Sequence, residues 1–274
     1  MKTTALLFPI FVYTTMVAMA QPKAGLKQVM ELQMPTNTRE MQGKNGACVA
    51  WHPEQKKYYA AFAGNSAFPL AIFDAKGARL SDDDMKCRID VRGLWYSPVK
   101  KQIWGNGYYQ NGWFSYKLTK DGLVQGITNE IEGEESQPED NAIGVYNTAS
   151  NRVLFLSYDA KVHSYNEKGK PRETIDIHWG RTREMGTDRD SYPDILQDYY
   201  NYYSLAYTGN KGQELGFLNV KEKQVELYDI KTGFLTKILT LPATAPVQEE
   251  YNFAYANGIY WLFDKENRRW LGYK

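Results

Sequence analysis

The residues best suited to recognition chemistry gather between positions 178 and 202. This stretch mixes aromatic, basic and acidic side chains without strand or helix periodicity. Aromatic rings and planar guanidinium groups are typical of binding surfaces, and long stretches without secondary structure are usually functional or disordered. We therefore expect ligand or partner contacts here from His178, Trp179, Arg181, Arg183 and Tyr192. The alternative is a loop that covers one end of the fold with its aromatic rings packed inward.

A second candidate is the glycine-rich stretch at positions 105–113, which reads G-N-G-Y-Y-Q-N-G-W. Adjacent aromatic residues beside Asn and Gln are suited to stacking on sugar rings. We name Tyr108, Tyr109 and Trp113 as candidate ligand contacts. The alternative is a tight turn, which this composition also favours.

Motifs for nucleophilic or metal chemistry are weak. Three histidines are present, and no two have the spacing of metal ligands on a helix or hairpin. Asp188, Asp190 and Asp194 suggest an oxygen-ligand cluster, but the Gly and the distal Glu of a calcium loop are missing. The sequence Gly-x-Ser-x-Gly is absent. We therefore name no catalytic residue, no metal site and no cofactor.

A repeated unit of four short strands must position these candidates. Its first copy, at positions 47–80, has apolar runs with two-residue alternation at 48–51, 57–62, 70–74 and 78–80, separated by turn residues. Four more copies follow, and an aromatic residue marks the first strand of each copy: Trp51, Tyr96, Tyr146, Tyr207 and Tyr255. The spacings between them are 45, 50, 61 and 48 residues. Four-stranded repeats of about 40 to 50 residues are typical of β-propellers.

The count of strands predicts how the ring closes. The fifth copy supplies three strands, while the alternating segment at positions 26–34 has no partner near it in the sequence. Pairing these two leaves no open sheet edge. We predict an all-β fold, a β-propeller of four-stranded antiparallel blades whose last blade is completed by the N-terminal strand. Five blades are favoured, and six would require a degenerate blade within positions 178–200.

Residues 1–20 have the pattern of a secretory signal peptide. Lys2 precedes an apolar run, and Ala18-Met19-Ala20 has the small-x-small form of a cleavage site. Cleavage before Gln21 leaves residues 21–274 as one β-propeller domain, exported to the periplasm or the cell exterior. That part holds equal numbers of basic and acidic residues, which gives no indication of nucleic acid binding. No later segment has the composition of a membrane span.

Cys48 and Cys87 are the only cysteines. In an exported protein they permit one disulfide. The alternative is one buried thiol and one incidental thiol. A bridge requires the two Cα atoms to lie within about 7 Å, so the sequence leaves both possibilities open.

Two turns carry a resemblance to a known class of propellers. Phe73-Asp74-Ala-Lys-Gly77 and Tyr228-Asp229-Ile-Lys-Thr-Gly233 follow third strands with an aromatic-Asp pair and a Gly turn. The chain resembles secreted bacterial propellers with NHL-like or TolB-like repeats, and the resemblance implies the propeller fold over most of residues 21–274.

Five-bladed propellers also include glycoside hydrolases, which place two carboxylates at the channel mouth. The expected first strands here carry no acid, although Asp90, Asp140 and Glu250 flank three of them. We therefore expect a non-enzymatic module that binds a ligand or partner through its loop face, with a glycan or an envelope protein as the partner. The alternative is a carbohydrate-active hydrolase or lyase that uses channel-mouth carboxylates.

Overall fold

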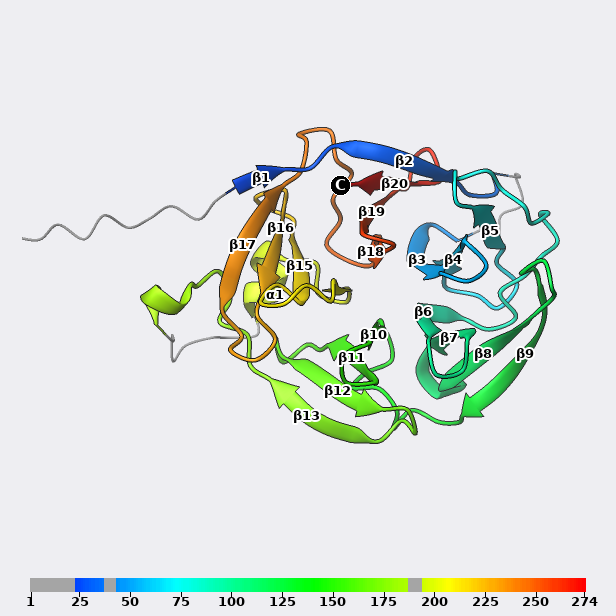
Figure 1. Ribbon diagram of the computed structural model, residues 1–274, viewed down its shortest axis with the longest axis horizontal. Helices are drawn as coiled ribbons and strands as arrows, with labels where there is room; N and C mark the ends of the chain where they lie inside the picture. Colours follow the sequence, from blue (N-terminus) through cyan, green and yellow to red (C-terminus); the bar gives the residue numbers. More distant parts are fainter. Residues whose placement is uncertain (1–22, 37–42, 187–193) are drawn as a thin grey trace, which may run out of the picture.

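The protein is a five-bladed β-propeller. The computed structural model describes residues 23–36, 43–186 and 194–274, and the strands of these parts form five blades in a ring (Figure 1). The first strand of each blade lies nearest the centre. The predicted signal peptide, residues 1–20, lies outside the described residues.

Within each blade the strands follow the chain outward from the centre. The strands of the first and second blades are β3 (Asn45–His52), β4 (Lys57–Ala63), β5 (Leu70–Asp74), β6 (Val91–Ser97), β7 (Gln102–Gly107), β8 (Trp113–Leu118) and β9 (Val124–Ile131). The strands of the third and fourth blades are β10 (Val145–Asn147), β11 (Arg152–Leu156), β12 (Val162–Asn166), β13 (Pro171–Ile175), β14 (Ala206–Tyr207), β15 (Leu215–Asn219), β16 (Gln224–Tyr228) and β17 (Leu235–Thr240). The fifth blade has β18 (Phe253–Ala256), β19 (Ile259–Asp264) and β20 (Arg269–Tyr273).

The N-terminal segment closes the ring. Strand β2 (Gln28–Gln33) pairs antiparallel with β20 and becomes the outer strand of the fifth blade, which confirms the predicted closure (Figure 1). Strand β1 (Lys23–Gly25) was not predicted. It pairs parallel with β17 on the fourth blade. One segment therefore joins two neighbouring blades.

The first blade differs from the prediction at its outer edge. A fourth strand was expected at positions 78–80, but in the described part of this blade only single bridge pairs, Phe73 with Arg79 and Pro69 with Lys86, take its place. The Ser81 hydroxyl accepts a hydrogen bond from the Ile72 amide at 3.0 Å, so a side chain replaces one rung of the expected ladder.

The connections also hold short elements that the periodicity did not predict. Residues 105–107 of the glycine-rich stretch belong to β7. The connections that the structure describes hold the 3-10 turns η1 (Tyr109–Asn111) and η2 (Arg183–Met185) and the helix α1 (Asp194–Tyr199). Among the described residues, none of the helices combines the length and apolar character that crossing a membrane requires.

Aromatic side chains fill the spaces between blades. Between the fifth and first blades, the ring of Phe62 meets that of Phe263 edge-on at 5.7 Å, and Leu32 of β2 is fully buried in the same cluster. A Cβ atom at Gly46 would lie 2.4 Å from the Trp270 ring, so only glycine allows this close approach. Close packing at these contacts fixes the angle between neighbouring blades.

Buried side-chain amides tie each of three blades to the next. The Asn106 amide group donates to the Ala142 carbonyl at 2.8 Å, that of Asn201 donates to the Tyr251 carbonyl at 2.6 Å, and the Asn252 side-chain carbonyl accepts from the Gly46 amide at 2.7 Å. Each of these three asparagines is at most 1% exposed. The Ala142 and Tyr251 carbonyls lie in connections between blades, and the Gly46 amide lies near the start of β3, so each buried amide satisfies a backbone group of a neighbouring blade or its connection.

The closing strand generates a stability prediction. Leu32→Ala removes a fully buried side chain from β2, so we expect the free energy of unfolding to fall by about 2 to 5 kcal/mol. Val29→Ala, on the same strand but 53% exposed, should change it by less than about 0.5 kcal/mol. Urea unfolding followed by tryptophan fluorescence measures both. Equal effects of the two substitutions would contradict the closing role of β2.

Candidate functional site

A pocket of about 270 Å³ lies at the centre of the ring. Residues from the inner strands of all five blades line it, including Ala50, Leu94, Val145, Tyr207 and Ala254, and Ile143 and Leu205 line it just before β10 and β14. Small and aliphatic side chains make up its inner wall because the inner strands converge there. The pocket is therefore a product of ring closure.

The pocket opens at the end of the ring where first and second strands connect. Its lining includes Pro53, Thr148, Gly209 and Asn257, which lie in the turns after β3, β10, β14 and β18. The inner strands thus point their carboxyl ends toward the opening.

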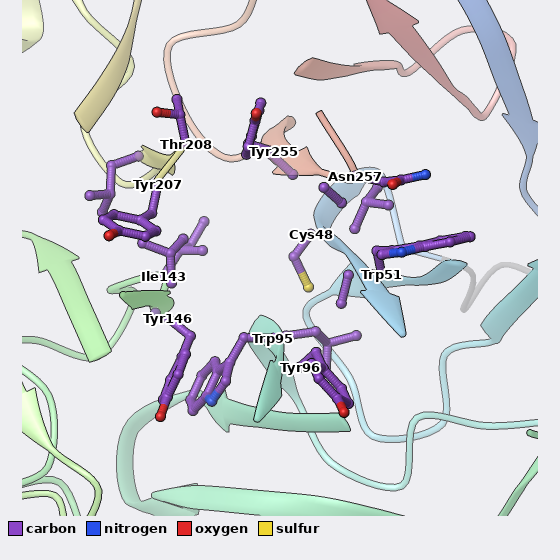
Figure 2. A pocket seen from close by; sticks show the side chains of 18 of the residues that line it. Cys48, Trp51, Trp95, Tyr96, Ile143, Tyr146, Tyr207, Thr208, Tyr255 and Asn257 are labelled. Atoms are coloured by element: carbon purple, nitrogen blue, oxygen red, sulfur yellow. The ribbon is translucent and has the colours of Figure 1, made fainter. Parts of the chain in front are cut away.

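Aromatic residues surround this opening, and each blade contributes one at the same position of the repeat, while Trp95 of the second blade lines the pocket as well (Figure 2). We call these five residues the aromatic collar: Trp51, Tyr96, Tyr146, Tyr207 and Tyr255. Figure 2 shows their rings fanning outward around the opening, with the thiol of Cys48 near its centre. These are the residues that mark the repeat in the sequence, so equivalent positions of the five blades converge on one site.

Neighbouring groups fix the orientation of the collar rings. The Trp51 ring packs on that of Tyr58 with centroids 4.5 Å apart. The Tyr96 hydroxyl donates to Glu54 at 3.2 Å, and the Tyr146 hydroxyl donates to Glu167 at 3.0 Å. A collar whose rings are held in place loses little conformational entropy when a ligand binds.

The pocket is electrically neutral. Among the described residues that line it there is no Asp, Glu, Lys, Arg or His, and Thr148, Thr208 and Asn257 supply its polar side chains. Burial raises the pKa of each collar tyrosine above its ordinary value, so all four phenols carry their protons at neutral pH. Such a site is suited to an uncharged ligand with apolar faces and a few hydroxyl groups.

The candidate loop at positions 105–113 lies at the opposite end of the ring. Gly107 at the end of β7 pairs with Val91 at the start of β6, whereas Gln102 pairs with Ser97 beside the turn near the pocket opening. Tyr108 and Tyr109 are 37% and 41% exposed at that far end. Their role in ligand binding stays a prediction.

Trp113 lies inside the protein. It is 1% exposed and packs edge-on against Trp95 with centroids 5.5 Å apart. The stretch that was considered for sugar stacking therefore presents two tyrosines to solvent and contributes its tryptophan to the core.

The segment at positions 178–202 packs largely against the fourth blade. The ring of His178 stacks on that of Phe234 with centroids 4.3 Å apart. Trp179 is 5% exposed, and its ring centroid lies 4.6 Å from that of Tyr200 and 4.7 Å from that of Phe217. The Trp179 indole donates to the Ala160 carbonyl at 3.0 Å. This part of the segment therefore packs its aromatic rings inward, as the alternative to a binding loop predicted.

The remaining predicted residues of this segment lie around η2. The Arg181 guanidinium donates to the Gly186 carbonyl at 3.0 Å, and Arg183 begins η2. Tyr192, Asp188 and Asp190 lie outside the described residues.

A buried carboxylate anchors the end of this segment. Glu226 of β16, 3% exposed, accepts hydrogen bonds from the Tyr200 hydroxyl at 2.7 Å and from the Tyr228 hydroxyl at 2.6 Å. Asn219 and Gln224 donate to its other oxygen at 2.9 and 2.8 Å. Four donors thus satisfy this carboxylate, as a buried charge requires.

The acids that flank the first strands lie away from the pocket. Asp90 bonds the Arg92 guanidinium at 2.5 Å just before β6, and Glu250 accepts a hydrogen bond from the Tyr202 hydroxyl before β18. The Asp140 carbonyl accepts from the Tyr109 amide at 3.4 Å, at the same far end. None of the three lines the central pocket.

Cys48 and Cys87 are both buried free thiols. Cys48 lines the pocket, whereas the Cys87 thiol donates a long hydrogen bond to the Pro69 carbonyl at 3.5 Å. Burial raises the pKa of Cys48 well above its ordinary value and that of Cys87 to about 12. In the described parts of the chain, no three His, Cys, Asp or Glu side chains are grouped so that they could hold a metal ion.

The collar is the feature that sequence reasoning missed as a site. The same five residues mark the repeat in the sequence, where their equivalent positions served only to align the five copies. Equivalent first-strand positions of a closed propeller must converge on its axis, so the repeat itself carried the signal.

Comparisons with known proteins support the fold. The chain matches no known family and no curated protein. Its structure is similar to that of Myxococcus xanthus glutaminyl cyclase, with a TM-score of 0.53 and 9% identity over 93% of this chain and 98% of that one.

Two other solved structures are similar at lower scores. The β-propeller domain of Myceliophteria thermophila Cps50 (Swd1) has a TM-score of 0.44 and 13% identity over 88% of this chain and 99% of that one. A chain of a nidogen/laminin complex has a TM-score of 0.39 and 11% identity over 75% and 67%. The five blades of the ring, together with the similarity at a TM-score of 0.53, confirm the predicted propeller fold.

The thiols generate a prediction about reactivity. Thiolates are the reactive form, and a raised pKa lowers the thiolate fraction at pH 8. We expect Ellman's reagent to label the folded protein at least about a hundredfold more slowly than the unfolded protein, and to find two thiols after guanidinium is added without reductant. Fewer than two thiols would indicate a disulfide, and rapid labelling of the folded protein would contradict the burial of both.

Proposed function

We propose that this protein is an exported, non-enzymatic binding module that holds a segment of a neutral glycan in the central pocket. One sugar ring occupies the pocket, and its neighbours rest on the aromatic collar. Export rests on the signal-like residues 1–20, and the glycan rests on the chemistry of the pocket.

The observation that carries the proposal is the aromatic collar around a neutral pocket. A sugar ring has apolar C–H faces and hydroxyl edges, so it gains from aromatic surface and from a few neutral hydrogen-bonding groups. Thr148, Thr208, Asn257 and the exposed backbone at the strand ends can supply those groups. Ligand sites of this kind are mostly apolar with a small number of polar contacts.

The size of the pocket sets the size of the ligand. Small-molecule sites usually measure about 300 to 1,000 Å³, so a volume of about 270 Å³ suits a single ring. Longer glycans would extend over the collar, where Trp51, Tyr96, Tyr207 and Tyr255 are partly exposed.

Hydrolysis by two carboxylates has no support at this pocket. That chemistry requires two acids about 5 to 10 Å apart across the ligand. The described lining of the pocket includes no acid, and Asp90 and Glu250 are engaged elsewhere. One solved structure with a similar fold is a glutaminyl cyclase, so the binding test below also follows product release.

The first test measures glycan binding by variants of the mature chain. Binding to a panel of neutral glycans should weaken about tenfold or more in Trp51→Ala and in Tyr255→Ala, because each substitution removes a large rigid contact surface. Tyr109→Ala serves as the matched control, since it removes an exposed tyrosine at the opposite end of the ring. Its affinity should stay within about twofold of the unmodified protein.

Thermal unfolding of each variant accompanies this test, since Trp51 also packs on Tyr58. If Tyr109→Ala loses binding while both collar variants retain it, the glycan site lies at the opposite end of the ring, which carries residues 105–113. Release of reducing ends or of any other product in the same wells would overturn the non-enzymatic assignment.

The raised pKa values of the collar tyrosines give a pH prediction. A phenol whose pKa lies above its ordinary value of about 10 stays protonated throughout the neutral range, so deprotonation begins at a higher pH than for a free tyrosine. Glycan affinity should therefore be constant from about pH 6 to pH 9. A titration by calorimetry measures it, and a change of more than about threefold would show that an ionising group contacts the ligand.

A further inference from the structure

A second cavity, of about 600 Å³, lies at the end of the ring opposite the collar. Its lining comprises Tyr158, Leu196, Gln197, Tyr202, Tyr203 and Glu249. Tyr158 lies between β11 and β12, Tyr202 and Tyr203 lead into β14, and Glu249 leads into β18. The cavity therefore lies where connections of the third, fourth and fifth blades meet.

Three tyrosine rings form one side of this cavity. The rings of Tyr158 and Tyr203 meet edge-on with centroids 5.6 Å apart, and those of Tyr202 and Tyr203 are tilted at 4.8 Å. The hydroxyls of Tyr158 and Tyr203 share a hydrogen bond of 2.6 Å. Tyr158 is nevertheless 47% exposed, so a ligand can reach its ring. We call these three residues the tyrosine cluster.

Negative charge surrounds the tyrosine cluster. Glu249 lines the cavity, Glu250 accepts a hydrogen bond from the Tyr202 hydroxyl, and Glu139 accepts one from the Tyr158 amide at 2.9 Å. Arg92 on this side stacks over the rings of Tyr108 and Tyr251 and is paired with Asp90. The charge around the cavity therefore favours a cation.

The two connections that carry the cluster and the acids are tied together before any ligand arrives. The buried Asn201 donates to the carbonyls of Gln248 at 3.0 Å and Tyr251 at 2.6 Å, and its side-chain oxygen accepts from the Ser204 amide at 3.0 Å. The Tyr202 amide also donates to the Glu249 carbonyl at 3.1 Å. The site is thus preorganised, which lowers the entropic cost of binding.

The mixture of rings and one carboxylate indicates which cation fits. Calcium and magnesium need about six or more oxygen ligands, and aromatic faces cannot supply them. An alkylated ammonium group is weakly hydrated and is attracted to aromatic faces, as in aromatic cages for choline and methylated lysine. A nearby carboxylate adds favourable charge without having to coordinate the group.

We propose that the cavity bounded by the tyrosine cluster and Glu249 is a binding site for a quaternary or methylated ammonium group. The proposal stands independently of the glycan site, because it uses different residues at the other end of the ring. Aromatic faces contact the alkyl groups, and Glu249 and Glu250 balance the charge.

Choline is the probe that tests this site. Calorimetric titration of the full mature chain at constant ionic strength should show saturable binding of choline. Its uncharged carbon analogue, 3,3-dimethylbutan-1-ol, has the same shape and should bind at least about tenfold more weakly. Equal binding of the two compounds, or no saturable binding of choline, would overturn the proposal.

Variants locate the binding and separate the ring from the charge. Tyr158→Ala should weaken choline binding at least about fivefold, Tyr158→Phe should keep it within about twofold, and Glu249→Gln should weaken it about threefold. Glu249→Gln alters an exposed side chain, so it remains informative if Tyr158→Ala fails to fold.

Two controls lie outside the cavity. Tyr199→Ala removes a tyrosine of α1 whose ring centroid lies 4.1 Å from the Lys221 ammonium nitrogen. Trp51→Ala alters the collar. Neither should change choline affinity by more than about twofold. Loss of choline binding in Trp51→Ala with retention in Tyr158→Ala would place the ammonium in the central pocket and overturn the assignment.

Discussion

The pairing of β2 with β20 is the interaction on which the rest of the structure depends. It joins residues 28–33 to the last strand of the chain and thereby converts a row of blades into a ring. An unpaired β20 would leave an open sheet edge and would expose Leu32, Trp270 and their neighbours to water. The parallel pairing of β1 with β17 also attaches the N-terminal segment to the fourth blade. A central pocket lined by five blades exists only when this closure is made.

The two ends of the ring offer different chemistry because they are built differently. At the collar end, short turns connect first and second strands, and equivalent positions of the repeat contribute one aromatic residue each. At the opposite end, the connections between blades vary in length and sequence, and the tyrosine cluster lies where those of the third, fourth and fifth blades meet. A repeated fold thus gives a site of approximate fivefold symmetry at one end and an asymmetric site at the other.

Buried polar groups hold the irregular connections in place. Asn106, Asn201 and Asn252 bond backbone groups of neighbouring blades or of the connections to them, and Glu226 anchors Tyr200 through a hydroxyl hydrogen bond. Burying such groups without hydrogen-bond partners is costly. Each connection therefore adopts the arrangement in which these hydrogen bonds form. The loops at the far end of the ring are therefore positioned by the blades beneath them.

The sequence by itself determined the blades and their closure. Two-residue alternation and turn residues are local properties of the chain, so β3, β4 and β5 fall close to where the pattern predicted them. The count of strands was enough to assign β2 to the last blade. The same local pattern failed at positions 78–80, where Ser81 replaces a strand rung with its side chain.

The tertiary structure alone decided which candidate residues reach a ligand. Aromatic residues favour both binding surfaces and cores, so composition could not distinguish Trp113 and Trp179, which are buried, from Tyr109, which is exposed. The collar residues are 45 to 61 positions apart, and Tyr158 is distant in sequence from Glu249. Local pattern carries no information about which of these side chains share a cavity, because their proximity depends on the angle and order in which whole blades pack around the axis.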